Sequence, residues 1–579
     1  MVTGASTPLE RARERLRGVA APVDAAVVAA LLLGGVYVYL AGLGATNLQA
    51  YDEAIYAAAA RNMLERGEWL VPHVHAMARD GALRPFMDKP PLVMWLQAVA
   101  MGALGPTEFA ARLPSALSAV GAGIVTYALG RELWSGSARL GRFVGAAGAA
   151  VFLTTPAVFR LMNGGRQGGT DMPLVLFGTL FVYATYRGLR SDRDARWLLV
   201  MGAAAGLAVL SKGVAAGTYA IATVPLLVLF RDRLQARLRP FLKGCAVTLL
   251  LVLPWPIYAL ATVPRVFVED FLLEQVLARA QGAVTSGSGL LPFMNYPYFT
   301  EFPRLMDPWV LFLALGTVAV PIAIYRAGGR RLRVARTTPG EGLTDLGATL
   351  FAAWWVVLVF FTYVAVGDHP WYLLPMYVPA GLVVARLGAL AAGIGGGSRR
   401  LGVAVVLVGV AALAGRLVVL PVGMPRYGPV VVGLLALGVT LGPELGAAVR
   451  RRAGDESGAR AALVALALLV AVAGVAAPVP QGGPASHAEQ KRFALATNEA
   501  VPAGAAIAVT EAATNEMFTY AFYLTDRSLA PVTAEGLGSD HRYALVTAAG
   551  RERIDRPYRV LARAEGEALD GAVVVVFEN

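Results

Sequence analysis

Tyr51-Asp52-Glu53 and Phe86-Met87-Asp88-Lys89-Pro90-Pro91 are the two charged stretches that decide the class of this chain. Both lie in one polar segment, 45–111, directly after the long apolar segment 24–44. Carboxylates and a lysine are rarely placed beside apolar helices unless they contact a substrate or an ion. The two stretches therefore predict a functional site at the surface of a membrane.

The composition is that of a membrane protein. Of the 579 residues, 56% are hydrophobic and only 16% are charged, whereas soluble domains carry about 25% charged residues. The net charge of +12 comes from arginines in short clusters between apolar segments, a pattern typical of cytoplasmic loops. We therefore predict the membrane as a partner and no nucleic acid. The single cysteine, Cys245, excludes an intramolecular disulfide.

Apolar segments long enough to cross a bilayer, about 17–25 residues each, recur along the chain. We predict a mainly α, polytopic membrane protein with about thirteen transmembrane helices. The predicted spans lie near 24–44, 112–130, 143–160, 173–186, 197–211, 213–230, 244–262, 308–325, 347–366, 371–392, 401–420, 428–444 and 461–478. The apolar run 92–105 is predicted as an interfacial helix within the first loop, because counting it as a span would move the next arginine cluster to the other side.

The arginine clusters predict the topology. They fall at every second connection, at 131–142, 187–196, 231–243, 326–336, 399–400 and 450–452. With residues 1–22 in the cytoplasm, all of these clusters are cytoplasmic. The transmembrane domain then spans 23–479, and its two long outer loops are 45–111 and 263–307. We expect an inner or plasma membrane protein, with no cleavage site evident before the first span.

The tail, 480–579, has a different pattern. Apolar and polar residues alternate at 506–510 and 543–547, and an apolar run fills 573–576, with glycine, proline and charged turns between them. This pattern predicts a small α/β domain. Its acidic residues outnumber its basic ones, so we expect a soluble extracytoplasmic domain.

Candidate site residues open and close the first outer loop. Asp52 and Glu53 begin a helical stretch. Their charges either stabilise its first turn through the helix dipole, by about 0.3–1 kcal/mol, or they act as a general base or metal ligand. One interpretation is that Asp88 and Lys89 form a surface ion pair. The other is that Lys89, which lies just before an apolar run, binds an anionic headgroup at the bilayer surface.

Further candidates lie in the later connections. Asp171 follows a glycine-rich turn and is either a helix cap or a functional carboxylate. Lys212, between two spans, requires a phosphate or a distant carboxylate unless it snorkels to the interface. Arg279 lies in the second long outer loop, and His369 with Tyr372 forms a polar point between two spans.

Several spaced motifs resemble those of a known family. They are Asp52-Glu53-x-x-Tyr56-Ala57, Gly67-x-Trp69-x-x-Pro72, Phe86-x-Asp88-Lys89-Pro90-Pro91-Leu92-x-x-Trp95, Phe109-Ala110-x-Arg112-Leu113-Pro114-Ser115, Ser211-Lys212-Gly213 and Tyr372-Leu373-Leu374-Pro375. Together they are similar to the aminoarabinose transferases of lipid A modification. Those belong with the protein O-mannosyltransferases among the polytopic glycosyltransferases of the C superfamily. The resemblance covers roughly 45–380.

The resemblance implies a sugar transfer from a polyprenyl phosphate to an acceptor on the outer face. In-line attack of the acceptor would invert the anomeric centre. Asp52 would be the catalytic base or the carboxylate that orients the acceptor, and Asp88 and Asp171 further catalytic acidic groups. Lys89 would hold the donor phosphate, with Lys212 and Arg279 as additional contacts. Residues expected at the substrate are Glu53, Tyr56, His369 and Tyr372.

Alternatives remain at this stage. The acceptor can be a lipid, a protein or a cell-wall glycan, the sugar a hexose or a pentose, and a divalent metal cofactor is neither required nor excluded. His73 and His75 alone are a weak metal motif. A transporter or flippase for a polyprenyl-linked glycan also needs cations at an outer site, although the paired repeats common in transporters are not evident.

Overall fold

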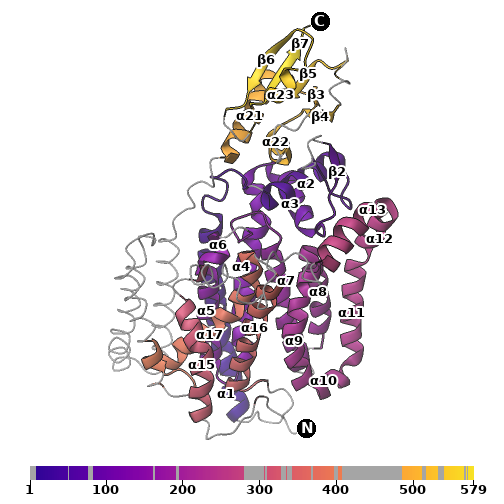
Figure 1. Cartoon of the computed structure of the whole chain (residues 1–579). Coiled ribbons are helices and arrows are strands. Elements are labelled where there is room, and N and C mark those ends of the chain that lie inside the picture. Colours follow the sequence, from indigo (N-terminus) through magenta and orange to yellow (C-terminus); the bar gives the residue numbers. More distant parts are fainter. Residues whose placement is uncertain are drawn as a thin grey trace, which may run out of the picture.

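The computed structural model describes most of the chain. The described residues are 8–49, 51–75, 82–160, 163–190, 195–278, 305–306, 309–327, 334, 342–366, 369–396, 399, 402–406, 486–510, 517–532, 537, 540–565, 569 and 571–578. They form a helical bundle with a small sheet-containing domain at one end (Figure 1). We call this the tail end of the bundle.

The first loop lies at the tail end, between α1 (Pro8–Leu40) and α4 (Glu108–Leu133). It contains α2 (Asp52–Arg66), α3 (Leu92–Leu104) and an antiparallel pair, β1 (His73–His75) with β2 (Leu83–Pro85). The two prolines before α3 fix where that helix begins, since proline suits a first helical turn. The helices predicted near 53–66 and 92–105 are confirmed.

After the first loop the chain forms the helices of the bundle. After α4, its elements are α5 (Ala138–Thr154), α6 (Pro156–Arg160), α7 (Asp171–Arg190), α8 (Trp197–Lys212), η2 (Gly213–Ala216), α9 (Gly217–Leu229), α10 (Arg231–Ala236), α11 (Leu238–Val252), α12 (Pro254–Thr262), α13 (Pro264–Val266), the π-helix η3 (Phe267–Ala278), α15 (Val310–Ala327), α16 (Asp345–Val366), η5 (Pro370–Met376) and α17 (Tyr377–Ala391).

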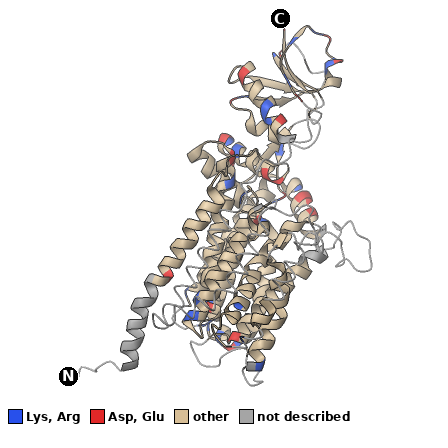
Figure 2. Cartoon of the chain, turned by 90° about the vertical axis from the view of Figure 1, so that its left-hand side faces the viewer, with Lys and Arg blue, Asp and Glu red and all other residues tan. Residues whose placement is uncertain are grey.

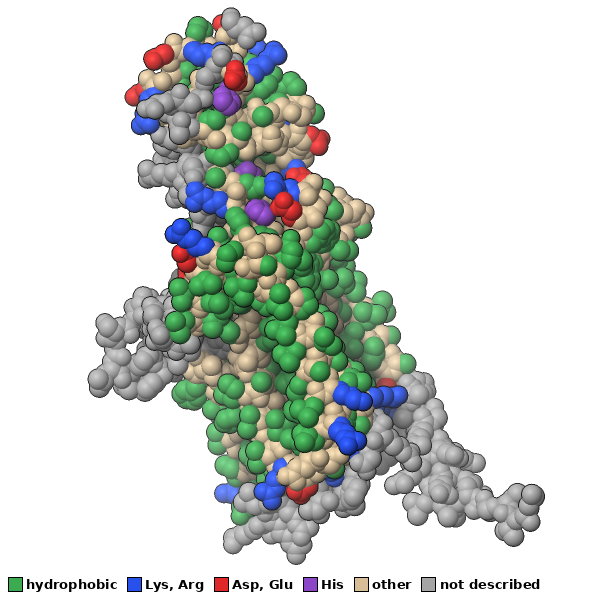
Figure 3. Space-filling model, turned by 90° about the vertical axis from the view of Figure 1, so that its right-hand side faces the viewer, with side chains coloured by type: hydrophobic (Ala, Val, Ile, Leu, Met, Phe, Trp, Pro, Cys, Tyr) green, Lys and Arg blue, Asp and Glu red, His purple; other side chains and the backbone are tan. Residues whose placement is uncertain are grey.

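Seven helical runs in the described part of the chain are long and apolar enough to cross a membrane. The predicted spans up to 371–392 all coincide with helices, although α5 and α15 are short. The predicted spans 428–444 and 461–478, and most of 401–420, lie outside the described residues, so the total of about thirteen stays a prediction. Figure 3 shows apolar side chains over the middle of the bundle, with charged side chains toward both ends, as expected for a multi-pass membrane protein.

Lys and Arg residues lie at the end of the bundle opposite the tail, and others lie at the tail end (Figure 2). At the end opposite the tail, Asp24 of α1 pairs with Arg131 at 3.0 Å and with Arg142 at 2.9 Å. Asp345, which begins α16, pairs with the buried Arg386 of α17 at 2.6 Å. These ion pairs connect helices that are distant in sequence, and the first two include Arg131 and Arg142 of the predicted cytoplasmic cluster 131–142.

The chain reverses between α8 and α9. Lys212, the last residue of α8, contacts the first residue of α7, whereas Arg233, after α9, donates a hydrogen bond to the carbonyl of Arg190 at the other end of α7, at 2.7 Å. Gly213 has a φ of 58°, a conformation that favours glycine. The turn predicted at Lys212 is therefore present and lies at the tail end.

The tail forms a five-stranded sheet with the order β4-β3-β5-β7-β6. Its strands are β3 (Ala506–Val509), β4 (Ser528–Pro531), β5 (Tyr543–Val546), β6 (Tyr558–Arg563) and β7 (Val573–Phe577). The first three strands of that order are parallel and the rest antiparallel. Its helices are α21 (Ser486–Ala500), α22 (Met517–Tyr523) and α23 (Ala548–Arg551), and α22 packs on α2. The strands predicted at 506–510, 543–547 and 573–576 are confirmed.

Candidate functional site

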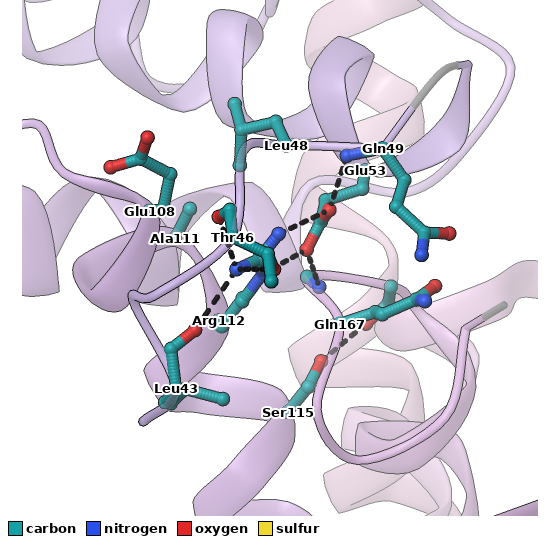
Figure 4. Close-up of polar contacts among 12 residues, drawn as sticks. Leu43, Thr46, Leu48, Gln49, Glu53, Glu108, Ala111, Arg112, Ser115 and Gln167 are labelled. Carbon is teal, nitrogen blue, oxygen red and sulfur yellow. Dashed lines mark hydrogen bonds and ion pairs between the residues drawn. The ribbon is translucent and has the colours of Figure 1, made fainter. Parts of the chain in front are cut away.

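A buried ion pair fixes the start of α2. The carboxylate of Glu53 accepts Arg112 Nε at 2.7 Å and Nη2 at 3.0 Å, and both side chains are 2% exposed (Figure 4). It also accepts the backbone N–H of Gln49 at 2.6 Å and that of Gly168 at 2.9 Å. Glu53, expected as a substrate contact, thus has its carboxylate held by donors of the protein itself.

The remaining donors of Arg112 hold the chain that precedes α2. They bind the carbonyls of Leu43 at 2.9 Å, Thr46 at 2.8 Å and Asn47 at 2.7 Å (Figure 4). Carbonyls in an irregular buried segment must find donors, because an unpaired one costs about 1–3 kcal/mol. The pair therefore ties the segment 43–49, α2, α4 and the glycine-rich segment before α7 into one unit.

Asp52, the neighbour of Glu53, is half-buried and has a different environment. Its Oδ2 accepts a hydrogen bond from Asn163 Nδ2 at 3.0 Å. Asn163 is 2% exposed and has a φ of 65°, and a Cβ on Gly169 would collide with its amide oxygen. The glycine-rich segment therefore aims Asn163 at Asp52. Sequence reasoning missed Asn163, although asparagine before two glycines is a signal for a left-handed turn.

Asp171 and Lys212 form a second buried pair. Lys212 Nζ lies 2.6 Å from both carboxylate oxygens of Asp171. Lys212 is 8% exposed and Asp171 is 2% exposed. The lysine ammonium is also 4.9 Å from the centroid of the Tyr372 ring. His369 lies edge-on to that ring, at 5.6 Å between centroids. Of the partners that the sequence left open for Lys212, the structure shows the distant carboxylate.

Lys89 connects the first loop to the π-helix η3. Its Nζ donates to Gln275 Oε1 at 2.9 Å and to the carbonyl of Asp88 at 3.3 Å. Gln275 is 8% exposed and was not predicted. π-helical turns often occur at functional sites, and this one lies within the predicted second long outer loop, 263–307. Asp88 itself is half-buried beside Lys89.

Tyr56 lies near three of the predicted carboxylates. It is 2% exposed and hydrogen-bonds with Thr170. Burial raises the pKa of Tyr56 well above its usual value, and the charges of Asp52, Asp171 and Asp88 raise it further. Asp171 is in turn within the electrostatic influence of Asp52 and Lys89. Asp52, Asp88 and Asp171 thus act on Tyr56, and Lys212, Asp52 and Lys89 act on Asp171, so these groups lie near one another at the tail end of the bundle.

Arg279 lies outside the described residues, so its role stays a prediction. Among the residues that the structure describes, no three or more His, Cys, Asp or Glu side chains gather closely enough to hold a metal ion. His73 instead pairs with Glu68 at 3.1 Å on the first loop, and burial lowers the pKa of His73.

Comparisons with known proteins identify relatives in sequence. Residues 88–258 match the family described as dolichyl-phosphate-mannose-protein mannosyltransferase. The undecaprenyl phosphate-alpha-4-amino-4-deoxy-L-arabinose arabinosyl transferase of Serratia proteamaculans is 26% identical over 358 residues, 60% of this chain and 56% of the relative. The protein of the same name from Erwinia tasmaniensis is 27% identical over 399 residues, 67% of this chain and 64% of the relative. The matched region thus spans less than two thirds of these relatives.

Solved structures extend the likeness over nearly the whole chain. ArnT from Cupriavidus metallidurans bound to undecaprenyl phosphate matches with a TM-score of 0.63 at 18% identity, covering 94% of this chain and 97% of that one. The apo state of the same protein matches with a TM-score of 0.59 at 19% identity. The resemblance predicted from the motifs is confirmed: residues 88–258 match the dolichyl-phosphate-mannose-protein mannosyltransferase family, and the chain has the fold of the ArnT structure.

Proposed function

We propose that this chain is an integral-membrane glycosyltransferase that moves a sugar from a polyprenyl phosphate to a hydroxyl or phosphate acceptor. The observation that carries the proposal is the grouping of carboxylates and cations at the tail end of a membrane bundle. There Asp171 binds Lys212 at 2.6 Å, Asp52 accepts a hydrogen bond from Asn163 at 3.0 Å, and Lys89, beside Asp88, donates to Gln275 at 2.9 Å. The reaction needs a carboxylate for the acceptor and a cation for the departing phosphate, and this site contains both. The names of the sequence relatives support an undecaprenyl-phosphate donor.

Asp52 is assigned as the general base. It is half-buried, so an acceptor can reach it, and the Asn163 amide fixes one of its oxygens. Taking the acceptor proton makes the oxygen a better nucleophile at the sugar carbon. The phosphate leaves from the opposite face, so the anomeric centre inverts. Glu53, one residue on, pairs with Arg112 and thereby fixes the start of the helix on which Asp52 lies.

Lys89 is assigned to the donor phosphate. Its ammonium donates to neutral oxygens of Gln275 and of the Asp88 backbone, and phosphate oxygens are stronger acceptors than these. Lys212 is bound to Asp171 at 2.6 Å, so it supports the site by balancing that carboxylate and reaches a phosphate only as a shared partner. Arg279 is kept as an additional phosphate contact.

The arrangement in the membrane completes the proposal. The end of the bundle opposite the tail faces the cytoplasm, about thirteen helices span an inner or plasma membrane, and the domain 480–579 lies outside. The acceptor is an envelope lipid, protein or glycan, and the transferred sugar is a hexose or a pentose. His369 and Tyr372, beside Lys212, are assigned to the sugar.

The test uses purified protein in detergent with a panel of undecaprenyl-phosphate-linked hexoses and pentoses and an envelope extract. Mass spectrometry should detect released undecaprenyl phosphate and a glycosylated acceptor. A transporter leaves the donor intact in detergent, because no compartment exists across which to move it. An intact donor across the whole panel would reject the transferase.

The substitution Lys89→Gln is expected to raise the KM for the donor by about ten- to a hundredfold, since a charge-assisted hydrogen bond contributes about 1.5–3 kcal/mol. Steady-state kinetics with varied donor measure it. Lys243→Gln, an exposed lysine of α11 beyond the site, is the control and should leave KM unchanged. An equal KM in both variants contradicts the assignment.

A further inference from the structure

The C-terminal domain is fastened to the helix that begins with Asp52. Arg61 of α2 is 6% exposed and donates to the carbonyls of Phe522 and of Ala521, the latter at 3.3 Å. These carbonyls belong to the last turn of α22, where a cation also complements the helix dipole. Buried side chains of α2 and of the tail, among them Ile55 and Tyr520, form one apolar cluster.

Tyr523 extends this attachment to the segment in front of α2. Its hydroxyl accepts the backbone N–H of Leu48 at 3.0 Å and donates to Glu108 Oε1 at 3.2 Å. Lys491 of α21 pairs with the same Glu108 oxygen at 2.5 Å. The next backbone N–H, that of Gln49, binds Glu53. Of two consecutive backbone N–H groups, that of Leu48 thus donates to the tail and that of Gln49 donates to the buried ion pair.

This segment has little support of its own. Residues 41–49 contain turns and no helix or strand, and Tyr51 has a φ of 60°, which is uncommon for a residue with a side chain. Arg112 holds the segment through its carbonyls, and Tyr523 holds it through Leu48, which is fully buried. Losing the Tyr523 hydroxyl would leave a buried N–H without that acceptor.

We infer that Tyr523 is a positioning residue through which the C-terminal domain sets the segment 43–53 and thereby Asp52, an inference that rests on the proposed function. The domain is then a structural part of the transferase site. Tyr523 acts through Leu48 and does not contact the reacting atoms.

The experiment compares Tyr523→Phe with Tyr520→Phe in the full chain. Both tyrosines are buried residues of α22, but the Tyr520 hydroxyl bonds to Thr497 within the tail, at 2.9 Å. Hydrogen exchange of peptides covering 43–53, thermal unfolding and transfer kinetics are measured for both. Only Tyr523→Phe should speed exchange in 43–53 and lower kcat, by about five- to tenfold for the loss of one such bond, with the donor KM unchanged.

The outcomes separate the two proposals. Equal exchange in 43–53 and equal kcat for both variants would overturn the inference. A wild-type protein that transfers no sugar would reject the proposed function, and the exchange data would still show whether Tyr523 holds the segment. A fall in Tm without faster exchange in 43–53 would reduce Tyr523 to a stability role and also contradict the inference.

Discussion

Replacing Asp52 with asparagine is expected to reduce sugar transfer by about 10²–10⁴-fold, the range for losing a general base. The substitution keeps the shape of the side chain and removes its capacity to take a proton. The cations that meet the donor phosphate, with Lys89 foremost, lie on other segments, so binding of undecaprenyl phosphate should change little. Transfer is followed by mass spectrometry of the acceptor, and binding by the shift in thermal unfolding with undecaprenyl phosphate.

Asp526→Asn provides the matched control. Asp526 is exposed in the tail and has a φ of 52°, a conformation that asparagine also tolerates. Its substitution should leave transfer unchanged. If Asp52→Asn retains wild-type transfer, the base lies elsewhere, and Asp88 and Asp171 become the groups to test by the same substitution.

The motifs predicted which residues belong to the site, but adjacent residues in a motif took different roles. Asp52 and Glu53 stand together in the sequence, and both read as site carboxylates. Successive residues of a helix point about 100° apart, so one faces Asn163 at the site and the other faces Arg112 in the protein interior. Hydrophobic pattern does not distinguish these directions, because both residues are charged.

The sequence did not predict which distant residues the site lysines would contact. Lys212 was seen to need a counter-charge, but Asp171 is 41 residues away and meets it only because the chain reverses at Gly213. Gln275 meets Lys89 across 186 residues, and a neutral amide beside acidic and apolar residues carries no signal of its own. The helices up to 392 were predictable, because the span of a bilayer fixes their length and hydropathy.

The largest stability effect is expected from Arg112→Met. The variant keeps much of the volume of the side chain but leaves the Glu53 carboxylate buried without its cation, and three carbonyls of the segment 43–49 lose a donor. Breaking one partner of a buried pair costs about 3–5 kcal/mol. Unfolding in detergent should show this loss as a large fall in Tm, and exchange in 43–49 should accelerate.

The double variant Glu53→Gln with Arg112→Met separates the charge from the carbonyl contacts. The double variant has no uncompensated buried carboxylate, so it should be more stable than Arg112→Met alone. Hydrogen exchange in 43–49 should still be faster than in the wild type, because the carbonyls of this segment lack the Arg112 donors. Arg265→Met is the surface control, since Arg265 is 85% exposed in its pair with Glu269, and exposed pairs contribute little. A double variant no more stable than Arg112→Met would mean that the carbonyl contacts, and not the Glu53 charge, dominate. The role of the pair would then be to hold the segment in front of Asp52, which the same exchange measurement detects.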